Sequence, residues 1–279
     1  MKAATGREVL AGEQEMELVT ELDTSISSTL MRGIEILQCF SAAEQELSNA
    51  EIARRMGLKR PTVSRLCKTL LHLGYLRKTQ TGAFRLAPRL LSLNYPVLAT
   101  MPWRHNVGAP MREMAEMCSG NASIGVMSGD SFVHVQTAGL PPSWPHVPDI
   151  GQSGPLHHSA LGWSILSMLP PKDYDAKIAE IRAIHGQDLE DSLLVMETAV
   201  ARCQTDGFCV SYGDWRPELV AAGAPIGRTE DGLFVAIACA VPRYRAVAEY
   251  FETDFGPRLA EAAASMRLSG VFRLPPRHA

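Results

Sequence analysis

Residues 47–74 constrain the fold of this chain more than any other segment, because they prescribe two short helices joined by a tight turn. Ser48 and Glu51 have the three-residue spacing of a capping box, which starts the first helix. Gly57 ends that helix. Pro61 suits the first turn of the next one, because its backbone angle is fixed and it lacks an amide proton. The segment therefore predicts a helix-turn-helix.

The flanking residues extend this pattern on both sides. Leu30, Ile34 and Leu37 recur at the spacing of one helix face and predict a preceding helix that ends near Phe40. After Gly74, residues 75–87 predict a short β-hairpin around a turn at Gln80, Thr81 and Gly82. Three helices followed by a hairpin are typical of a winged helix-turn-helix.

Charge is distributed unevenly along the chain. Residues 28–90 hold eleven basic and four acidic side chains, a net charge of +7, although the whole chain carries −3. Residues 1–27 carry −4 and residues 91–279 carry −6. A compact positive block between two negative ones is typical of a polyanion-binding module attached to a domain that does not bind nucleic acid. The alternative is an ordinary three-helix bundle with a solvated basic face.

The second helix of the helix-turn-helix has the side chains that a recognition helix needs. Arginine can contact guanine edges with two hydrogen bonds, whereas lysine, serine and threonine more often bind phosphates. We expect either Arg60 or Arg65 to contact a base. The candidate DNA-contacting residues are Ser48, Arg54, Arg55, Lys59, Arg60, Thr62, Ser64, Arg65 and Lys68, with Lys78 and Arg85 in the wing.

The remainder of the chain predicts an α+β domain. Hairpin-linked strands alternate with helices after residue 107, which favours an antiparallel sheet. Pro96 and Pro102 should kink or break the helical linker that precedes it. The predicted organisation is a mobile tail (1–25), a winged helix-turn-helix (26–87), a linker (88–106), a sensor domain (107–270) and a second tail (271–279).

Several segments resemble the IclR family of bacterial transcriptional regulators. Leu47–Leu70, LSNAEIARRMGLKRPTVSRLCKTL, is similar to that family's helix-turn-helix, and GYLRKTQTGAFRLA to its wing. Three later segments resemble the second domain of the family: GPLHHSALGWSILSML at 154–169, DGFCVSYGDWRPELVAAGAPI at 206–226 and DGLFVAIACAVP at 231–242. Two positions depart from the family pattern. Trp163 follows Gly162 where the family commonly has Lys, and Ala87 replaces a glycine that ends the wing strand.

The resemblance implies a GAF-like carboxy-terminal domain that binds a small organic effector, an organic acid or aromatic catabolite. It also implies that a homodimer or a dimer of dimers binds a double-stranded DNA operator. Tryptophans are more often core residues than ligand contacts, so both roles stay open for Trp163 and Trp215. The candidate effector-binding residues are His157, Ser159, Trp163, Ser211, Asp214, Trp215 and Cys239.

The sequence lacks the signatures of the main rival, an enzyme or scaffold whose winged helix contacts protein. It has no G-x-S-x-G elbow, no dinucleotide-binding loop and no P-loop. On a helix His157 and His158 would point about 100° apart and could not share a metal. A zinc site built from one of them with His134, Cys209 or Cys239 is the alternative. We expect no catalytic residues, cofactor, metal or membrane contact, and a cytoplasmic protein.

Overall fold

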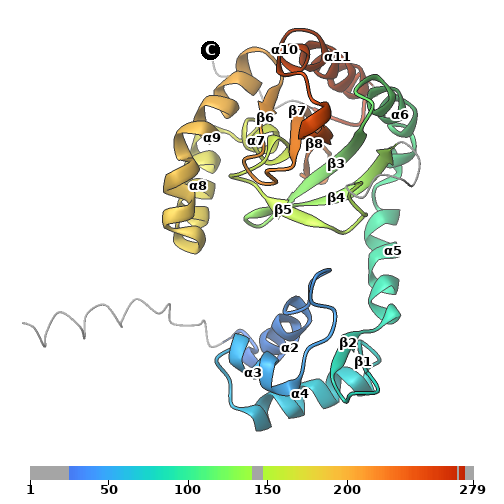
Figure 1. The fold of residues 1–279 in the computed structure, drawn as a ribbon, viewed down its shortest axis with the longest axis vertical. Helices are drawn as coiled ribbons and strands as arrows, with labels where there is room; N and C mark the ends of the chain where they lie inside the picture. Colours follow the sequence, from blue (N-terminus) through green and yellow to red (C-terminus); the bar gives the residue numbers. More distant parts are fainter. Residues whose placement is uncertain (1–24, 140–146, 269, 274–279) are drawn as a thin grey trace, which may run out of the picture. The chain divides into compact units, whose positions relative to one another are not determined.

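The computed structural model describes residues 25–139, 147–268 and 270–273 (Figure 1). The predicted tail at 1–24 and most of the tail at 271–279 lie outside these residues. The chain divides into two compact units, residues 1–96 and 97–279, and the division falls inside the predicted linker. No helix among the described residues is both long and apolar enough to cross a membrane.

The amino-terminal unit is a winged helix-turn-helix. Ser48 caps the second helix by accepting a hydrogen bond from the Glu51 amide at 3.1 Å. The hairpin strands pair antiparallel, with Leu76 opposite Leu86, and the backbone of Leu47 bridges to Phe84 of the wing. The predicted order is thus confirmed. The elements are α2 (Ser28–Gln38), α3 (Asn49–Arg55), α4 (Arg60–His72), β1 (Leu76–Lys78) and β2 (Phe84–Leu86).

The apolar residues that predicted α2 are not all buried. Leu30 and Ile34 are 66% and 49% exposed, whereas Ile36 is fully buried and Leu37 is partly buried. Helical spacing detects apolar residues on one side of a helix but does not say what covers them. Ile26, which precedes α2, is exposed as well.

Helix α5 (Leu91–Ala99) continues through Pro96, so of the two outcomes predicted for this proline, a kink or a break, the break does not occur. A proline inside a helix removes a single backbone hydrogen bond, and here only three helical residues follow it. The helical path changes instead at Pro102, which opens a short 3-10 turn (Pro102–His105). Leu98 of α5 is partly buried. The other large apolar side chains of this helix are exposed: Leu91, Leu93, Tyr95 and Val97.

The carboxy-terminal unit is built on a six-stranded antiparallel sheet with the order β5-β4-β3-β8-β7-β6. This confirms the predicted α+β class and agrees with the GAF-like fold that the resemblance implied. The strands are β3 (Asn121–Ser128), β4 (Ser131–Gly139), β5 (Ser153–Pro155), β6 (Cys209–Ser211), β7 (Leu219–Arg228) and β8 (Phe234–Pro242).

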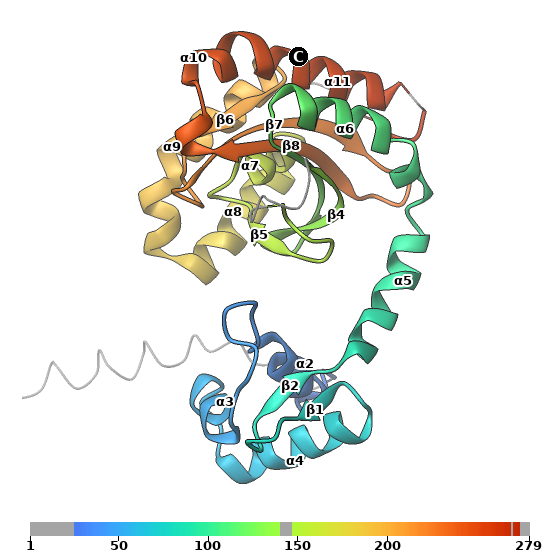
Figure 2. The ribbon, with the colours of Figure 1, turned by 45° about the vertical axis from the view of Figure 1, so that its right-hand side comes forward.

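Helices cover both faces of this sheet (Figures 1 and 2). Helices α6 (Gly108–Met117) and α11 (Gly256–Arg267) pack on one face, next to Ile237 and Cys239 of β8. Helix α7 (Ala160–Leu166) packs on the other, next to Ala236 and Ala238. It approaches β7 so closely that a Cβ at Gly223 would lie 2.3 Å from the Ala160 carbonyl oxygen. The short helix α10 (Ala248–Tyr250) and a π-helical turn (Phe251–Phe255) lead into α11.

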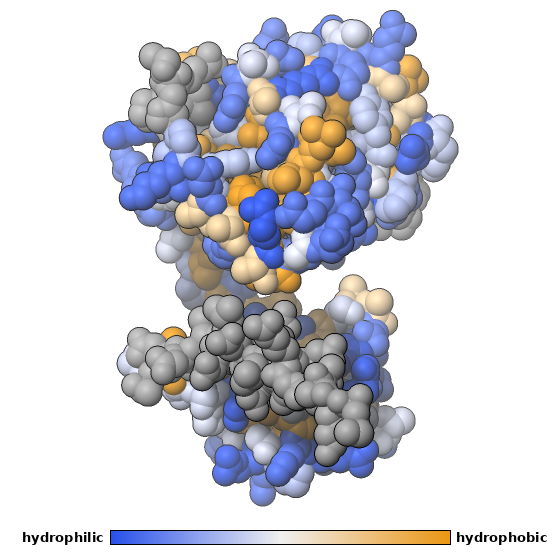
Figure 3. Space-filling model, turned by 90° about the vertical axis from the view of Figure 1, so that its left-hand side faces the viewer, coloured by the Kyte–Doolittle hydropathy of each residue, from blue (hydrophilic) through white to orange (hydrophobic). Residues whose placement is uncertain are grey.

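Two long helices, α8 (Pro171–His185) and α9 (Gln187–Thr205), lie beyond α7. Figure 3 views the unit from their side, where apolar side chains lie among hydrophilic ones. Ile184, Leu194 and Val195 of these helices are 59%, 77% and 47% exposed. Apolar side chains are therefore exposed on this side of the unit.

Candidate functional site

The outer surface of α4 carries exposed cationic side chains. Val63, Leu66 and Leu70 are buried, and this orients the opposite side of the helix outward. Among the described residues, no carboxylate lies within ion-pairing distance of the basic side chains of this segment. Lys59, Arg60, Ser64, Arg65 and Lys68 are exposed, and Thr62 is half-buried. This surface has the free positive charge that a phosphate backbone requires.

Arg55 does not belong to this free surface, although its charge suggested a phosphate contact. Its guanidinium is paired with Glu44 at 2.6 Å and Glu51 at 3.0 Å, and it donates to the Cys39 carbonyl at 2.9 Å. Hydrogen bonds from Arg54 and Arg55 lower the pKa of Glu51 to about 2. Arg55 therefore fastens α3 to the preceding loop. Sequence spacing revealed its charge but not these partners.

The other candidate DNA-contacting residues differ in how accessible their side chains are. Arg54 is 72% exposed and pairs with Glu51 at 2.6 Å, so its outer edge is accessible. Lys78 is exposed on the wing, whereas Arg85 pairs with Glu46 at 3.0 Å. The Ser48 hydroxyl is occupied as the cap of α3. The amino end of α4 and the tip of the wing thus form the most open basic surface of this unit.

A cavity of about 140 Å³ lies in the carboxy-terminal unit, between the amino end of α7 and the sheet face that α7 covers. Its wall comes from all the strands except β5, from the start of α7, and from the segments that join β4 to β5 and β6 to β7. The lining residues are Asn121, Ser123, Phe132, His134, Val147, Pro148, Gln152, Ser159, Ala160, Leu161, Ser211, Trp215, Arg216, Leu219, Ala221, Ala238 and Ala240.

Among the described residues of this wall, Arg216 has the one permanently charged side chain. Its guanidinium lies 4.7 Å from the Trp215 ring centroid, and its nearest carboxylate, Glu218, is 3.9 Å away. Burial and the nearby Arg216 lower the pKa of His134 to about 4, so this imidazole is neutral at pH 7. Its Nδ1 atom is buried and has no hydrogen-bond partner in the part of the chain that the structure describes. Apolar walls with one cation and a few unsatisfied polar atoms are suited to a small organic anion.

Three of the predicted effector-binding residues lie in the cavity wall: Ser159, Ser211 and Trp215. Asp214 does not; it accepts a hydrogen bond from Ser211 Oγ at 2.7 Å and so orients that wall residue. Arg216, His134, Asn121 and Ser123 were missed. For Asn121, Ser123 and His134 a signal was available. Side chains alternate between the two faces of a strand, so every second residue of β3 and β4 lies on the α7 side of the sheet.

The other predicted effector-binding residues lie outside the cavity. Cys239 is buried on the opposite face of the sheet, because its neighbours Ala238 and Ala240 are the ones that point toward α7. Trp163 is 1% exposed and packs in the core with residues of α8 and α9. Its indole nitrogen donates to the His157 carbonyl at 2.8 Å. His157 is also buried, and its Nε2 atom lies 3.0 Å from Asp188 rather than at the cavity.

Both units of the chain are similar to known proteins. Residues 29–80 match the family model described as the IclR helix-turn-helix domain, and residues 96–267 match the model of the bacterial transcriptional regulator IclR carboxy-terminal domain. The HTH-type transcriptional regulator TsaQ1/TsaQ2 of Comamonas testosteroni is 26% identical over 92% of this chain and 93% of its own length. The p-hydroxybenzoate hydroxylase transcriptional activator of Acinetobacter baylyi is 25% identical over 85% and 90%. A crystal structure of an IclR family regulator from Brucella abortus superimposes with a TM-score of 0.79, at 28% identity over 91% of this chain and 95% of that one.

Proposed function

The chain belongs to the IclR family of bacterial transcriptional regulators, and from this premise we propose how its two units work. The family membership makes it a DNA-binding regulator with a helix-turn-helix and an effector-binding domain. We assign operator contacts to α4 and the wing, and effector binding to the cavity beside Arg216. A regulator of this kind acts on chromosomal DNA in the cytoplasm, and we assign it no catalytic step.

The size and the wall residues of the cavity support a proposal for the effector. A cavity of about 140 Å³ is close in size to the engineered cavity of roughly 150 Å³ that holds benzene. One aromatic ring or a short aliphatic chain therefore fits. Phe132 and Trp215 meet edge to face at 5.9 Å and offer apolar contact, while Arg216 offers charge. We propose a small carboxylate, aromatic or aliphatic, whose anionic group pairs with Arg216.

Exposed apolar side chains support the proposal that two or four copies assemble. Leu30 and Ile34 lie about one turn apart on α2, with Ile26 just before the helix, and Leu91, Leu93, Tyr95 and Val97 are exposed around α5. Contiguous exposed apolar surface marks an interaction site. A dimer would present two recognition helices to a pseudo-palindromic operator, with half-sites about 10 base pairs apart or a multiple of that spacing.

Replacing Arg65 with alanine tests the recognition helix. If Arg65 contacts a guanine edge, the variant should lose about 1–3 kcal/mol of operator affinity and accept other bases at one position. Lys68→Ala should instead weaken binding to all sequences alike and reduce the salt dependence. Fluorescence anisotropy with operator and scrambled duplexes at several salt concentrations distinguishes the two results.

Arg60→Ala measures the second candidate for the base contact, and Arg55→Ala is the structural comparison. Unchanged affinity in both the Arg60 and Arg65 variants would exclude α4 as the recognition helix. An absence of any salt-dependent DNA binding would favour the scaffold alternative. The same titrations give the number of chains per operator, and one chain bound at full affinity would contradict the dimer.

Replacing Arg216 with glutamine tests the effector site. A charged hydrogen bond contributes about 1.5–3 kcal/mol, so the affinity for a carboxylate effector should fall roughly 10- to 150-fold. Arg216→Lys keeps the charge but loses the planar fork, so an intermediate loss is expected. Calorimetric titration with a panel of carboxylates and their uncharged amides measures this. Two results together identify the ion pair: Arg216→Gln binds the acid and the amide equally well, and relative to wild type it loses affinity for the acid alone.

DNA affinity without effector should survive these substitutions, because Arg216 lies in the carboxy-terminal unit and not on the basic surface of α4. An effector changes DNA affinity only by binding two states of the protein unequally. Coupling of about 1–3 kcal/mol is the usual scale, which corresponds to roughly 5- to 150-fold. An effector that binds Arg216→Gln as tightly as wild type would place its carboxylate elsewhere.

A further inference from the structure

A second group of titratable side chains lies in the carboxy-terminal unit, away from the cavity wall. His157 and His158 belong to the loop between β5 and α7. His185 is the last residue of α8, and Asp188 lies in the first turn of α9. Because the two histidines are in a loop, the objection that adjacent helical residues point apart does not apply to them.

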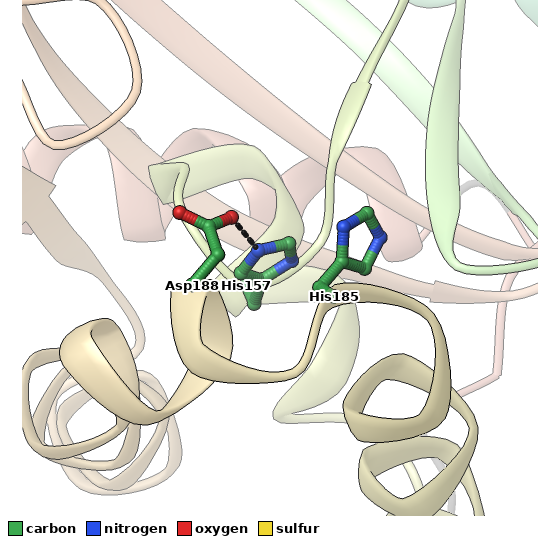
Figure 4. Close-up of side chains that lie close together, drawn as sticks. All are labelled: His157, His185 and Asp188. Carbon is green, nitrogen blue, oxygen red and sulfur yellow. Dashed lines mark hydrogen bonds and ion pairs between the residues drawn. The ribbon is translucent and has the colours of Figure 1, made fainter.

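The turn between α8 and α9 brings two of these residues to the same side. Gly186 joins the helices with a φ of +51°, a conformation that favours glycine. His185 and Asp188 therefore both face the loop that carries His157. Figure 4 shows His157 between Asp188 and His185. One donor atom from each of the three lies within 4.8 Å of the other two, and among the described residues no other group of histidine, cysteine and acidic side chains is so arranged.

Neighbouring residues hold this trio in place. His158 Nε2 lies 3.1 Å from Asp188 Oδ1, while His157 Nε2 lies 3.0 Å from Asp188 Oδ2. His185 Nε2 lies 2.8 Å from Asp130 Oδ2. Histidines that bind metals almost always use one ring nitrogen for the ion and hydrogen-bond a carboxylate or carbonyl through the other. The bond to Asp130 leaves Nδ1 of His185 for such a role.

His157 is the most deeply buried of the three side chains. It is 1% exposed, and its Nε2 atom lies 3.0 Å from Asp188 Oδ2. The two ring nitrogens of an imidazole point to opposite sides, so an ion bound by both His157 and Asp188 must take Nε2 and replace the contact between them. Among the described residues the buried Nδ1 atom has no hydrogen-bond partner, and it would then carry the ring proton.

We propose that His157, His185 and Asp188 bind one divalent transition-metal ion of the zinc class, with His158 and Asp130 as the residues that position them. Bonds of about 2.0–2.2 Å in a tetrahedral site place donor atoms roughly 3.3 Å apart, so a small inward movement closes the trio on an ion. Two imidazoles and one carboxylate favour zinc, cobalt or nickel over magnesium and calcium, which prefer oxygen ligands alone. Three protein ligands leave one position open.

The proposed site ties the α8–α9 corner to the loop before α7. That loop leads directly to Ser159, which caps α7 and lines the cavity. An ion bound there would stabilise the carboxy-terminal unit against unfolding, because it binds the native arrangement of two segments that are separate in the sequence. The affinity should fall below about pH 6, since protons compete for the histidine nitrogens.

The test uses the full chain, freed of metal with a chelator and titrated with Zn²⁺ in a calorimeter. We expect one ion per chain and a higher melting temperature with Zn²⁺. Titration with Co²⁺ should give the intense visible absorption of a four-coordinate ion. His185→Ala and Asp188→Asn should each weaken binding by about 100-fold or more, and Asp130→Asn by roughly 10- to 100-fold.

The choice of variants keeps these results interpretable. His185 and Asp188 have side chains that are 29% and 60% exposed, so their substitution should leave the fold intact by circular dichroism. His105→Ala removes an exposed histidine elsewhere and should bind Zn²⁺ like wild type. The proposal is overturned if His185→Ala binds Zn²⁺ as tightly as wild type, if no binding stronger than that of a surface histidine is found, or if His134→Gln abolishes it instead.

Discussion

Replacing Trp163 with alanine is expected to lower the free energy of unfolding of the carboxy-terminal unit by about 3–5 kcal/mol. The indole is 1% exposed and packs in one cluster with Leu189, Met196 and Ala199 of α9. Alanine would leave a large void between α7 and α9, because a packed interior relaxes only in part around a lost side chain. Urea denaturation followed by circular dichroism measures the loss.

Two comparison variants separate packing from effector binding. Trp163→Phe keeps most of the apolar volume but loses the 2.8 Å hydrogen bond to the His157 carbonyl, so it should cost less than alanine. Trp215→Ala removes a half-buried ring from the cavity wall and should reduce effector affinity more than stability. An unchanged denaturation midpoint in Trp163→Ala, with altered effector affinity, would show that the indole is a ligand contact.

Acidification from pH 6.5 to 4 is expected to destabilise the carboxy-terminal unit through His134. Its pKa falls from 6.5 to about 4 in the folded protein, chiefly because of burial and secondly because of Arg216. Between these values the unfolded chain binds the proton and the folded chain does not. Stability from this residue is therefore complete above pH 6.5 and is lost as pH falls, by about 3 kcal/mol at pH 4.

The contribution of His134 is the difference between wild type and His134→Gln across this pH range. Burial also lowers the pKa of His157, so wild type retains a slope in the same direction that the variant should share. His105→Gln, at an exposed position, should follow wild type. If His134→Gln loses stability on acidification as steeply as wild type does, His134 is protonated in the folded protein or does not titrate there.

The local sequence determined the helix-turn-helix almost completely. The Ser48 cap, the turn at Gly57 and the proline at the start of α4 act over a few residues, so their structural effect does not depend on the rest of the chain. The same holds for the outward basic side chains of α4, because their inner neighbours are apolar at helical spacing. The family resemblance extended this to the fold of the second domain.

Only the tertiary structure decided which side chains line the cavity and which pair with each other. The sequence placed Trp163, Cys239 and Ser211 in neighbouring segments, but the pleat of β8 turns Cys239 to the far face and α9 covers Trp163. Likewise, no local pattern relates His157 to Asp188, since thirty-one positions separate them along the chain. Local signals specify elements through short-range sterics and hydrogen bonds, whereas a site depends on which faces of those elements the packed core brings together.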